Sequence, residues 1–155
     1  MIIIGIFTLI QKLFSPKDKN LALTEEQEID EQWVILAQQN NLKILQKYYG
    51  ETRFGPAYMH LKSDPSIDFF TDKIFGDWFF YYDDGIFLQQ CNSISEPDTS
   101  VLFVDTITFN VRILQENIPS INWDMIETDN KKLLLTCDTG NELLKYNIEI
   151  FPDSV

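Results

Sequence analysis

Residues 78–88 read WFFYYDDGIFL, and this stretch gives the clearest indication of the fold. Two runs of aromatic and β-branched residues flank Asp83, Asp84 and Gly85. Aromatic and β-branched side chains favour strands, and Asp and Gly tolerate the positive φ that a tight hairpin turn requires. The stretch therefore predicts a β-hairpin whose turn is formed by these three residues.

A second hairpin is expected closer to the C-terminus. Residues 131–137 and 143–150 have strand composition, and the segment between them, 138–141, reads DTGN, which is typical of a turn. Alternation in the last strand separates an inward from an outward face. The residues expected to face inward are Leu144, Tyr146, Ile148 and Ile150.

Several shorter segments complete the strand-rich part of the chain. Residues 101–113 alternate between apolar and polar side chains, which predicts one strand with a face toward water. Its apolar face is expected to hold Ile107, Phe109, Val111 and Ile113. We also expect a short strand at 57–62, a helical turn within 66–74, and a loop or short extended piece at 118–126.

The residues before the strands have the pattern of a helix. Thr24 and Gln27 form a capping box, and acidic residues in the first turn favour the positive end of a helix dipole. Apolar residues then recur at helical spacing, namely Ile29, Trp33, Leu36 and Ala37. The pattern resumes at 42–49 and stops at Gly50, so it predicts one long helix, or two helices separated at 38–41.

This order of elements, helices first and then strands with short connections, favours the α+β class. We expect N-terminal helical segments packed on a mainly antiparallel, meander-like β-sheet. A length of 155 residues fits one domain. The expected organisation is an apolar leader helix and linker at 1–23, followed by a single α+β domain at 24–155.

The leader begins with MIIIGIFTLI, an apolar run too short to span a membrane. On a helix, four of its large side chains share one face, namely Ile3, Phe7, Ile10 and Phe14. This helix either packs on the domain or contacts a membrane surface through residues 1–16, where nearby lysines would assist it. Those lysines are Lys12, Lys17 and Lys19.

The charge of the chain limits the partners that it can bind. Twelve basic and 24 acidic residues give a net charge of −12, which disfavours nucleic acid and attracts basic proteins. Cys91 and Cys137 lie in apolar, strand-like stretches, and we interpret them as reduced and buried, as in a cytoplasmic protein. A single disulfide between them is the alternative.

The sequence contains no recognisable catalytic, metal-binding or cofactor-binding motif. His60 is the only histidine, and two cysteines without a C-x-x-C spacing do not form a zinc site. Neither acidic turn matches a calcium-binding EF-hand loop, and no glycine-rich phosphate loop occurs. We therefore expect a protein without cofactor or bound metal that is not an enzyme, unless carboxylates distant in sequence converge in a pocket.

One segment has the composition of a contact surface. Residues 74–111 contain no Lys or Arg, but they combine aromatic rings with six acidic residues. Interfaces favour aromatic residues, and acidic patches speed encounter with basic partners. The candidate partner-binding residues are Asp77, Trp78, Asp83, Asp84, Glu96, Asp98 and Asp105. Alternatively, the rings belong to the core and the acids to the solvated faces of strands and turns.

These observations favour a non-catalytic protein-binding module. In charge, size and aromatic content the chain is similar to bacterial immunity proteins, a resemblance that implies inhibition of a basic toxin or enzyme. A second hypothesis is a peripheral membrane or adaptor domain, because the stretch 118–123 before 131–137 resembles strand-rich pleckstrin-like domains. The third hypothesis is an enzyme with a carboxylate site of an unfamiliar kind.

Overall fold

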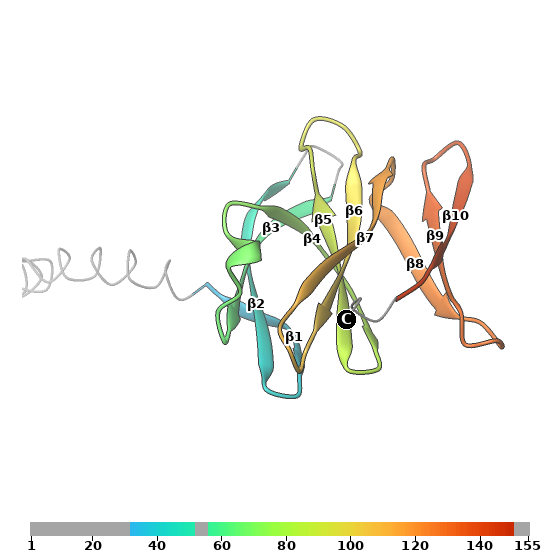
Figure 1. The fold of residues 1–155 in the computed structure, drawn as a ribbon. Helices are drawn as coiled ribbons and strands as arrows, with labels where there is room; N and C mark the ends of the chain where they lie inside the picture. Colours follow the sequence, from blue (N-terminus) through green and yellow to red (C-terminus); the bar gives the residue numbers. More distant parts are fainter. Residues whose placement is uncertain (1–31, 52–55, 151–155) are drawn as a thin grey trace, which may run out of the picture. The chain divides into compact units, whose positions relative to one another are not determined.

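The computed structural model of the chain describes residues 32–51 and 56–150, and these residues are almost entirely β-structure (Figure 1). The strands are β1 (Val34–Gln39), β2 (Leu42–Glu51), β3 (Ala57–Asp64), β4 (Ile74–Tyr82), β5 (Gly85–Cys91), β6 (Thr99–Asp105), β7 (Val111–Ile118), β8 (Asn122–Glu127), β9 (Leu133–Asp138) and β10 (Leu143–Ile148). A single 3-10 turn, η1 (Asp68–Phe70), is the helical element of the described residues.

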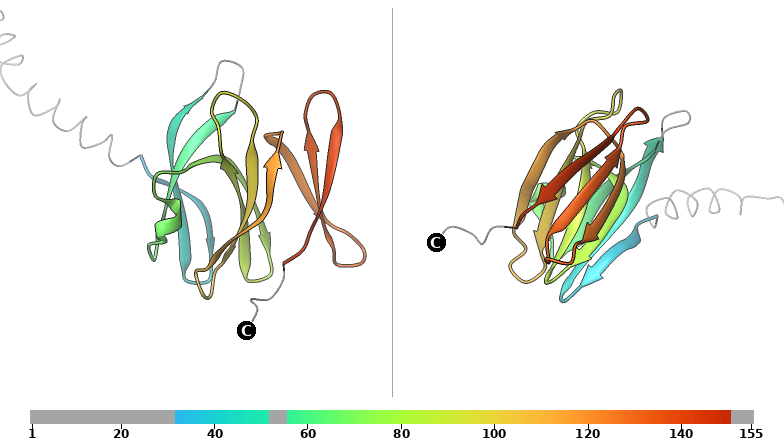
Figure 2. Two further views of the ribbon diagram at one scale, coloured as in Figure 1. Left: turned by 45° about the horizontal axis from the view of Figure 1, so that its top comes forward. Right: turned by 90° about the vertical axis from the view of Figure 1, so that its right-hand side faces the viewer.

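The strands form two antiparallel sheets. Strands β1 to β7 make a seven-stranded sheet in chain order, here called sheet A. Strands β8 to β10 make a three-stranded sheet in the order β10-β9-β8, here called sheet B. Figures 1 and 2 show sheet B as a separate layer beside sheet A. Every connection within a sheet joins neighbouring strands, so both sheets are meanders.

The fold has two hydrophobic cores, one on each face of the central strands β5 and β6. Successive side chains of these strands point alternately into one core and the other. One core lies within the curve of sheet A and contains Ile86, Leu88, Leu102 and Val104. The other core lies between sheets A and B, and there sheet A contributes Phe87, Val101 and Phe103. Because both faces are covered, each strand contains an unbroken apolar stretch, at 86–88 in β5 and at 101–104 in β6.

Sheet A curls until β1 reaches the turn of the β4–β5 hairpin. The backbone N–H of Gln38 donates to the Tyr81 hydroxyl at 2.9 Å, and Gln39 Nε2 donates to the Asp83 carbonyl at 2.6 Å. Asn40 Nδ2 donates to Thr106 Oγ1 at 2.8 Å. These polar contacts fasten the first strand over the core within the curve.

The expected hairpin at 78–88 is confirmed, with Tyr82 paired to Gly85 across the turn. Asp83 adopts the positive φ of 51° that the turn requires. Gly85 is needed for a different reason, because a Cβ there would lie 1.9 Å from Cζ of Phe103. The glycine makes room for an aromatic ring of β6.

The expected helix is contradicted from Trp33 onward, and with it the α+β class. Residues 34–51 form the antiparallel pair β1–β2, closed by a turn at Asn40 and Asn41, where Asn40 has φ 51°. Leu42 and Ile44 are fully buried on one face of β2. Burial at every second residue is typical of a strand, although the apolar residues of this segment also fit helical spacing. Within residues 32–51 and 56–150, the two core faces of sheet A are therefore covered by its own curvature and by sheet B, and no helix takes part.

The other expectations have mixed outcomes. The second hairpin is confirmed as β9–β10, and the inward faces of β10 are those expected. The strand expected at 101–113 is broken by a turn at 106–110, so that β6 and β7 are separate and antiparallel. Phe109, expected on the face of a strand, has φ 63° in that turn. The short strand at 57–62 and the helical turn within 66–74 are confirmed by β3 and η1.

The leader and linker at 1–23, and the start of the expected helix at 24–31, lie outside the described residues. Among the described residues, no helix is long and apolar enough to cross a membrane.

Candidate functional site

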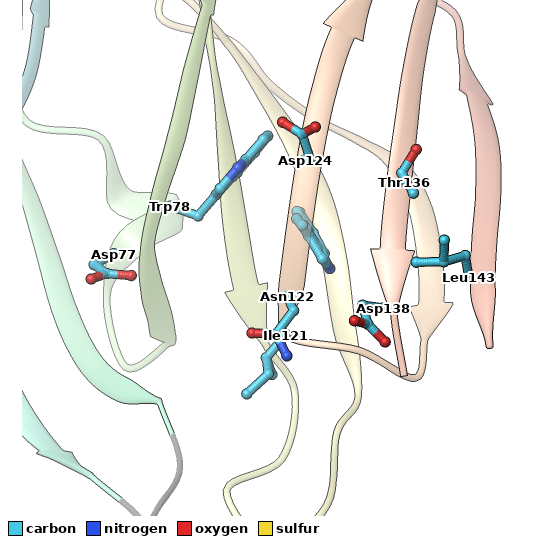
Figure 3. A pocket seen from close by; sticks show the side chains of 9 residues that line it. Asp77, Trp78, Ile121, Asn122, Asp124, Thr136, Asp138 and Leu143 are labelled. Atoms are coloured by element: carbon cyan, nitrogen blue, oxygen red, sulfur yellow. The ribbon is translucent and has the colours of Figure 1, made fainter. Parts of the chain in front are cut away.

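An open pocket of about 370 Å³ lies where β4 of sheet A passes β8 of sheet B (Figure 3). This volume lies in the range of small-ligand sites. The residues that line it are Asp77, Trp78, Ile121, Asn122, Trp123, Asp124, Thr136, Asp138 and Leu143. They come from β4, from β8 and the residue before it, and from the β9–β10 hairpin.

Two tryptophans form the aromatic part of the pocket. The rings of Trp78 and Trp123 meet edge to face, with centroids 5.1 Å apart and planes inclined at 71°. Figure 3 shows the Trp78 side chain extending from β4 toward β8. Trp123 Nε1 donates a hydrogen bond of 2.9 Å to the Ser120 carbonyl, which fixes the orientation of its indole.

The segment before β8 is held firmly in place. Thr99 Oγ1 donates to the Ser120 carbonyl at 2.7 Å, and the Ser120 hydroxyl donates to the Asp138 carbonyl. Gln89, which is buried on β5, donates from Nε2 to the Ile121 carbonyl at 3.0 Å. These contacts join both sheets to one wall of the pocket, so the wall is preorganised.

Gly76 makes the position of Gln89 possible. A Cβ at Gly76 would lie 2.1 Å from Gln89 Oε1, so any larger residue would displace the Gln89 side chain. The glycine therefore supports the pocket indirectly, through the hydrogen bond between Gln89 and Ile121.

Three aspartates line the pocket, and Figure 3 shows the carboxylate of Asp77 on the other side of β4 from Trp78. Asp77 lies on β4, Asp124 on β8 and Asp138 at the end of β9. All three are exposed to solvent, and Asp138 Oδ1 also accepts the backbone N–H of Gly140 at 2.7 Å. Among the described residues that line the pocket there is no Lys, Arg or His.

The pocket runs across the edge strand of sheet B. Successive side chains of a strand point to opposite faces, so Trp123 points to the core while Asn122 and Asp124 point outward. In register, Asp124 pairs with Thr136, which in turn pairs with Lys145 of β10. Asp124, Thr136 and Lys145 therefore form one row across the outer face of sheet B, with Lys145 two strands away from Asp124.

The candidate residues from the sequence do not form one surface. Asp77 and Trp78 line the pocket, but Asp83, Asp84 and Asp105 lie at the far end of β4, in or beside two turns. Glu96 and Asp98 lie in the connection between β5 and β6.

Asp105 and its neighbours have a structural role in their turns. Asp105 Oδ1 accepts the backbone N–H groups of Ile107 at 2.8 Å and Thr108 at 2.9 Å. Slight burial acts to raise the pKa of Asp105, but these hydrogen bonds outweigh it and hold the pKa below its ordinary value. Asn40 Nδ2 also approaches Asp84 Oδ1 at 3.3 Å, so acids at this end are partly engaged within the fold.

Sequence reasoning missed the contribution of sheet B to the pocket. Trp123, Asp124 and Asp138 are 45 or more residues beyond Trp78 in the chain, and only the packing of β8 beside β4 brings them together. One signal was available, because Trp123-Asp124 repeats the pairing of ring and acid in Asp77-Trp78.

The remaining reactive side chains lie elsewhere in the fold. Cys91 and Cys137 are free and buried, as expected, and burial raises the pKa of each thiol to about 11. His60 Nδ1 lies 3.3 Å from the Lys73 carbonyl, and its ring meets Tyr49 edge to face. Within residues 32–51 and 56–150, no three His, Cys, Asp or Glu side chains are grouped as a metal site.

Comparison of the chain with models of protein families, with characterised proteins and with solved structures found no match. A function must therefore be inferred from the residues of this chain and their arrangement.

Proposed function

We propose that the chain is a non-catalytic protein-binding module that recognises a basic partner at the pocket between β4 and β8. The observation that carries this proposal is the composition of the pocket, which combines Trp78 and Trp123 with three aspartates and no basic residue among its described lining. Aromatic anchors in a preformed hollow are typical of interface hot spots.

Two effects of charge support this proposal at different ranges. A net charge of −12 attracts basic proteins from a distance and speeds their encounter with the chain. At contact, the carboxylates of Asp124 and Asp138 would pair with cationic groups, while the indole faces would cover apolar stems. Asp77, on the other side of β4 from Trp78, would add to the negative potential nearby (Figure 3).

The likeness to immunity proteins rests on charge, size and aromatic content and not on fold, because the described residues are β-structure and not α+β. Inhibition of a basic toxin or enzyme is one form that such binding could take. We place the module in the cytoplasm, where reduced and buried thiols such as Cys91 and Cys137 are the norm.

The test is capture of partners by the immobilised full chain at low salt, followed by measurement of the affinity of each purified partner. We expect a basic protein whose affinity falls as salt rises, since screening weakens exposed charge pairs. The double variant Asp77→Asn/Asp124→Asn should lose affinity, by about two- to fivefold for each charge removed.

A matched control is the double variant Asp83→Asn/Asp84→Asn, which removes the same charge at the other end of β4. It should retain most of the affinity. If only this control loses binding, the partner site lies at the hairpin turn and the proposed pocket is wrong. If no basic protein is retained, the binding-module proposal itself fails.

A further inference from the structure

We propose that the pocket binds arginine side chains of the partner in preference to lysine side chains. This inference rests on the proposed function, which requires only that the partner be basic. It adds the chemical group that the pocket selects, and that selection follows from the tryptophan pair and from the openness of the pocket.

The arrangement of the two indoles favours a planar cation. Because their planes are inclined at 71° and their centroids are 5.1 Å apart, the edge of one ring meets the face of the other, and further ring surface is left to line the pocket. A guanidinium group stacks flat on such a face, whereas an ammonium is a compact point charge. Because Trp123 faces the core, this contact falls to Trp78, whose side chain extends from β4 toward β8 (Figure 3). The hydrogen bond from Trp123 Nε1 to Ser120 holds the indole against which Trp78 packs.

The carboxylates favour the same group. Asp124 lies on the outer face of β8, next to the pocket, and its carboxylate is exposed. Guanidinium can donate two parallel hydrogen bonds to one carboxylate, and this forked geometry is unavailable to lysine. Asn122 and Thr136 supply further side-chain oxygens that can accept the remaining N–H groups.

The openness of the pocket strengthens the preference. An ammonium is strongly hydrated, so an open site gains little by removing part of its water shell. Guanidinium is weakly hydrated and loses less on stacking against an indole. A metal ion is a poor fit because the acids of the described residues do not gather into a set of three ligands.

The test uses three synthetic peptides of one sequence that carry arginine, lysine or citrulline at the same positions. Citrulline has nearly the shape of arginine but no charge. Affinities for the full chain are measured by calorimetry at low salt. We expect the arginine peptide to bind at least about threefold more tightly than the lysine peptide and about tenfold more tightly than the citrulline peptide.

Two variants locate the effect. Trp78→Leu should weaken binding of the arginine peptide by about tenfold or more, and Asp124→Asn by about two- to fivefold. The control is Phe79→Leu, which removes an exposed ring from the neighbouring position of β4. It should leave the affinity within about twofold of the native chain. Thermal unfolding verifies that each variant is folded. If Trp78→Leu does not fold, Asp124→Asn still tests the proposal.

The outcomes separate the two proposals. Equal binding of arginine and lysine peptides, or equal binding of arginine and citrulline peptides, overturns the arginine preference and leaves a general site for basic partners. If none of the three peptides binds while a basic protein still binds with salt-dependent affinity, the arginine preference is wrong and the proposed function stands. If neither peptides nor basic proteins bind, both proposals fall.

Discussion

Gly85, the first residue of β5, allows close packing against Phe103 of β6. The ring of Phe103 occupies the space where a Cβ would stand, so the absence of a side chain lets β5 and β6 approach closely. Gly76 has the same relation to Gln89, which holds the pocket wall through Ile121. Both glycines are required by packing between strands.

Gly85→Ala should therefore destabilise the fold by about 1–3 kcal/mol, as overpacked cores do. Urea unfolding measures the change. The double variant Gly85→Ala/Phe103→Leu should lose less than the sum of the two single changes, because the smaller side chain relieves the clash. The control is Gly50→Ala, where a Cβ meets nothing within 4 Å, and a loss there as large as at Gly85 would refute this explanation.

The two buried thiols predict a dependence of stability on pH. Burial raises the pKa of Cys91 and Cys137 from 9.0 to about 11, and the charge of Asp77 adds to this effect at Cys91. The folded state thus holds these protons more tightly than the unfolded state does. The stabilisation is complete below about pH 9 and is lost as the pH rises toward about 11.

The variant Cys91→Ala/Cys137→Ala isolates this contribution from other groups that titrate in the same range. The free energy of unfolding, measured in urea across this pH window, should fall less steeply for the variant than for the native chain. Equal slopes would show that the thiols ionise alike in the folded and unfolded states.

At the scale of elements, sheet B packs on one face of sheet A and closes the core between the two sheets. The β8–β10 meander presents Met125, Leu133, Leu135, Cys137 and Ile148 to sheet A, and each of these side chains is buried. Burial of aliphatic side chains in this layer supplies a large part of its stability, at roughly 25 cal/mol for each Å² of apolar surface removed from water.

Leu135→Ala tests this cover directly. Leu135 is fully buried between the sheets, so the cavity left by its truncation should lower the free energy of unfolding by about 2–5 kcal/mol. Ile126→Ala, on the outer face of β8 and 49% exposed, should change it by less than about 1 kcal/mol. Similar small losses for both variants in chemical denaturation would mean that sheet B does not close this core.

Most of the β-structure after residue 56 could be predicted from the sequence, because its turns carry their own signals. Asp83, Asp84 and Gly85, and the segment 138–141, mark hairpins by residue type. The strands β1 and β2 could not, since their apolar residues fit both a helical and a two-residue period. Only the buried positions Leu42 and Ile44 decide between the two, and burial depends on tertiary packing.

The pocket was predictable only in part for a related reason. Asp77 and Trp78 were recognised because they belong to the aromatic, acidic segment 74–111, whereas Trp123, Asp124 and Asp138 join them through packing of the two sheets. The acids at Asp83, Asp84 and Asp105 looked equivalent by composition. Their positions at the far end of β4 separate them from the tryptophans, and a linear reading of charge does not give that distance.

At the scale of the whole molecule, a net charge of −12 sets the range of partners and the pocket sets where they bind. A second hollow, of about 320 Å³, is lined by Lys131 and Lys132 together with Tyr82 from the far end of β4. The two hollows therefore differ in the sign of their charge, and a basic partner should distinguish between them.

The most direct measurement maps the nuclear magnetic resonance signals of the full chain as the arginine peptide is added. We predict that the largest changes occur at the indole N–H groups of Trp78 and Trp123 and at the backbone amide of Asp124. Changes concentrated at Asp83, Asp84 and Asp105 instead would place the site at the hairpin turn and contradict the account.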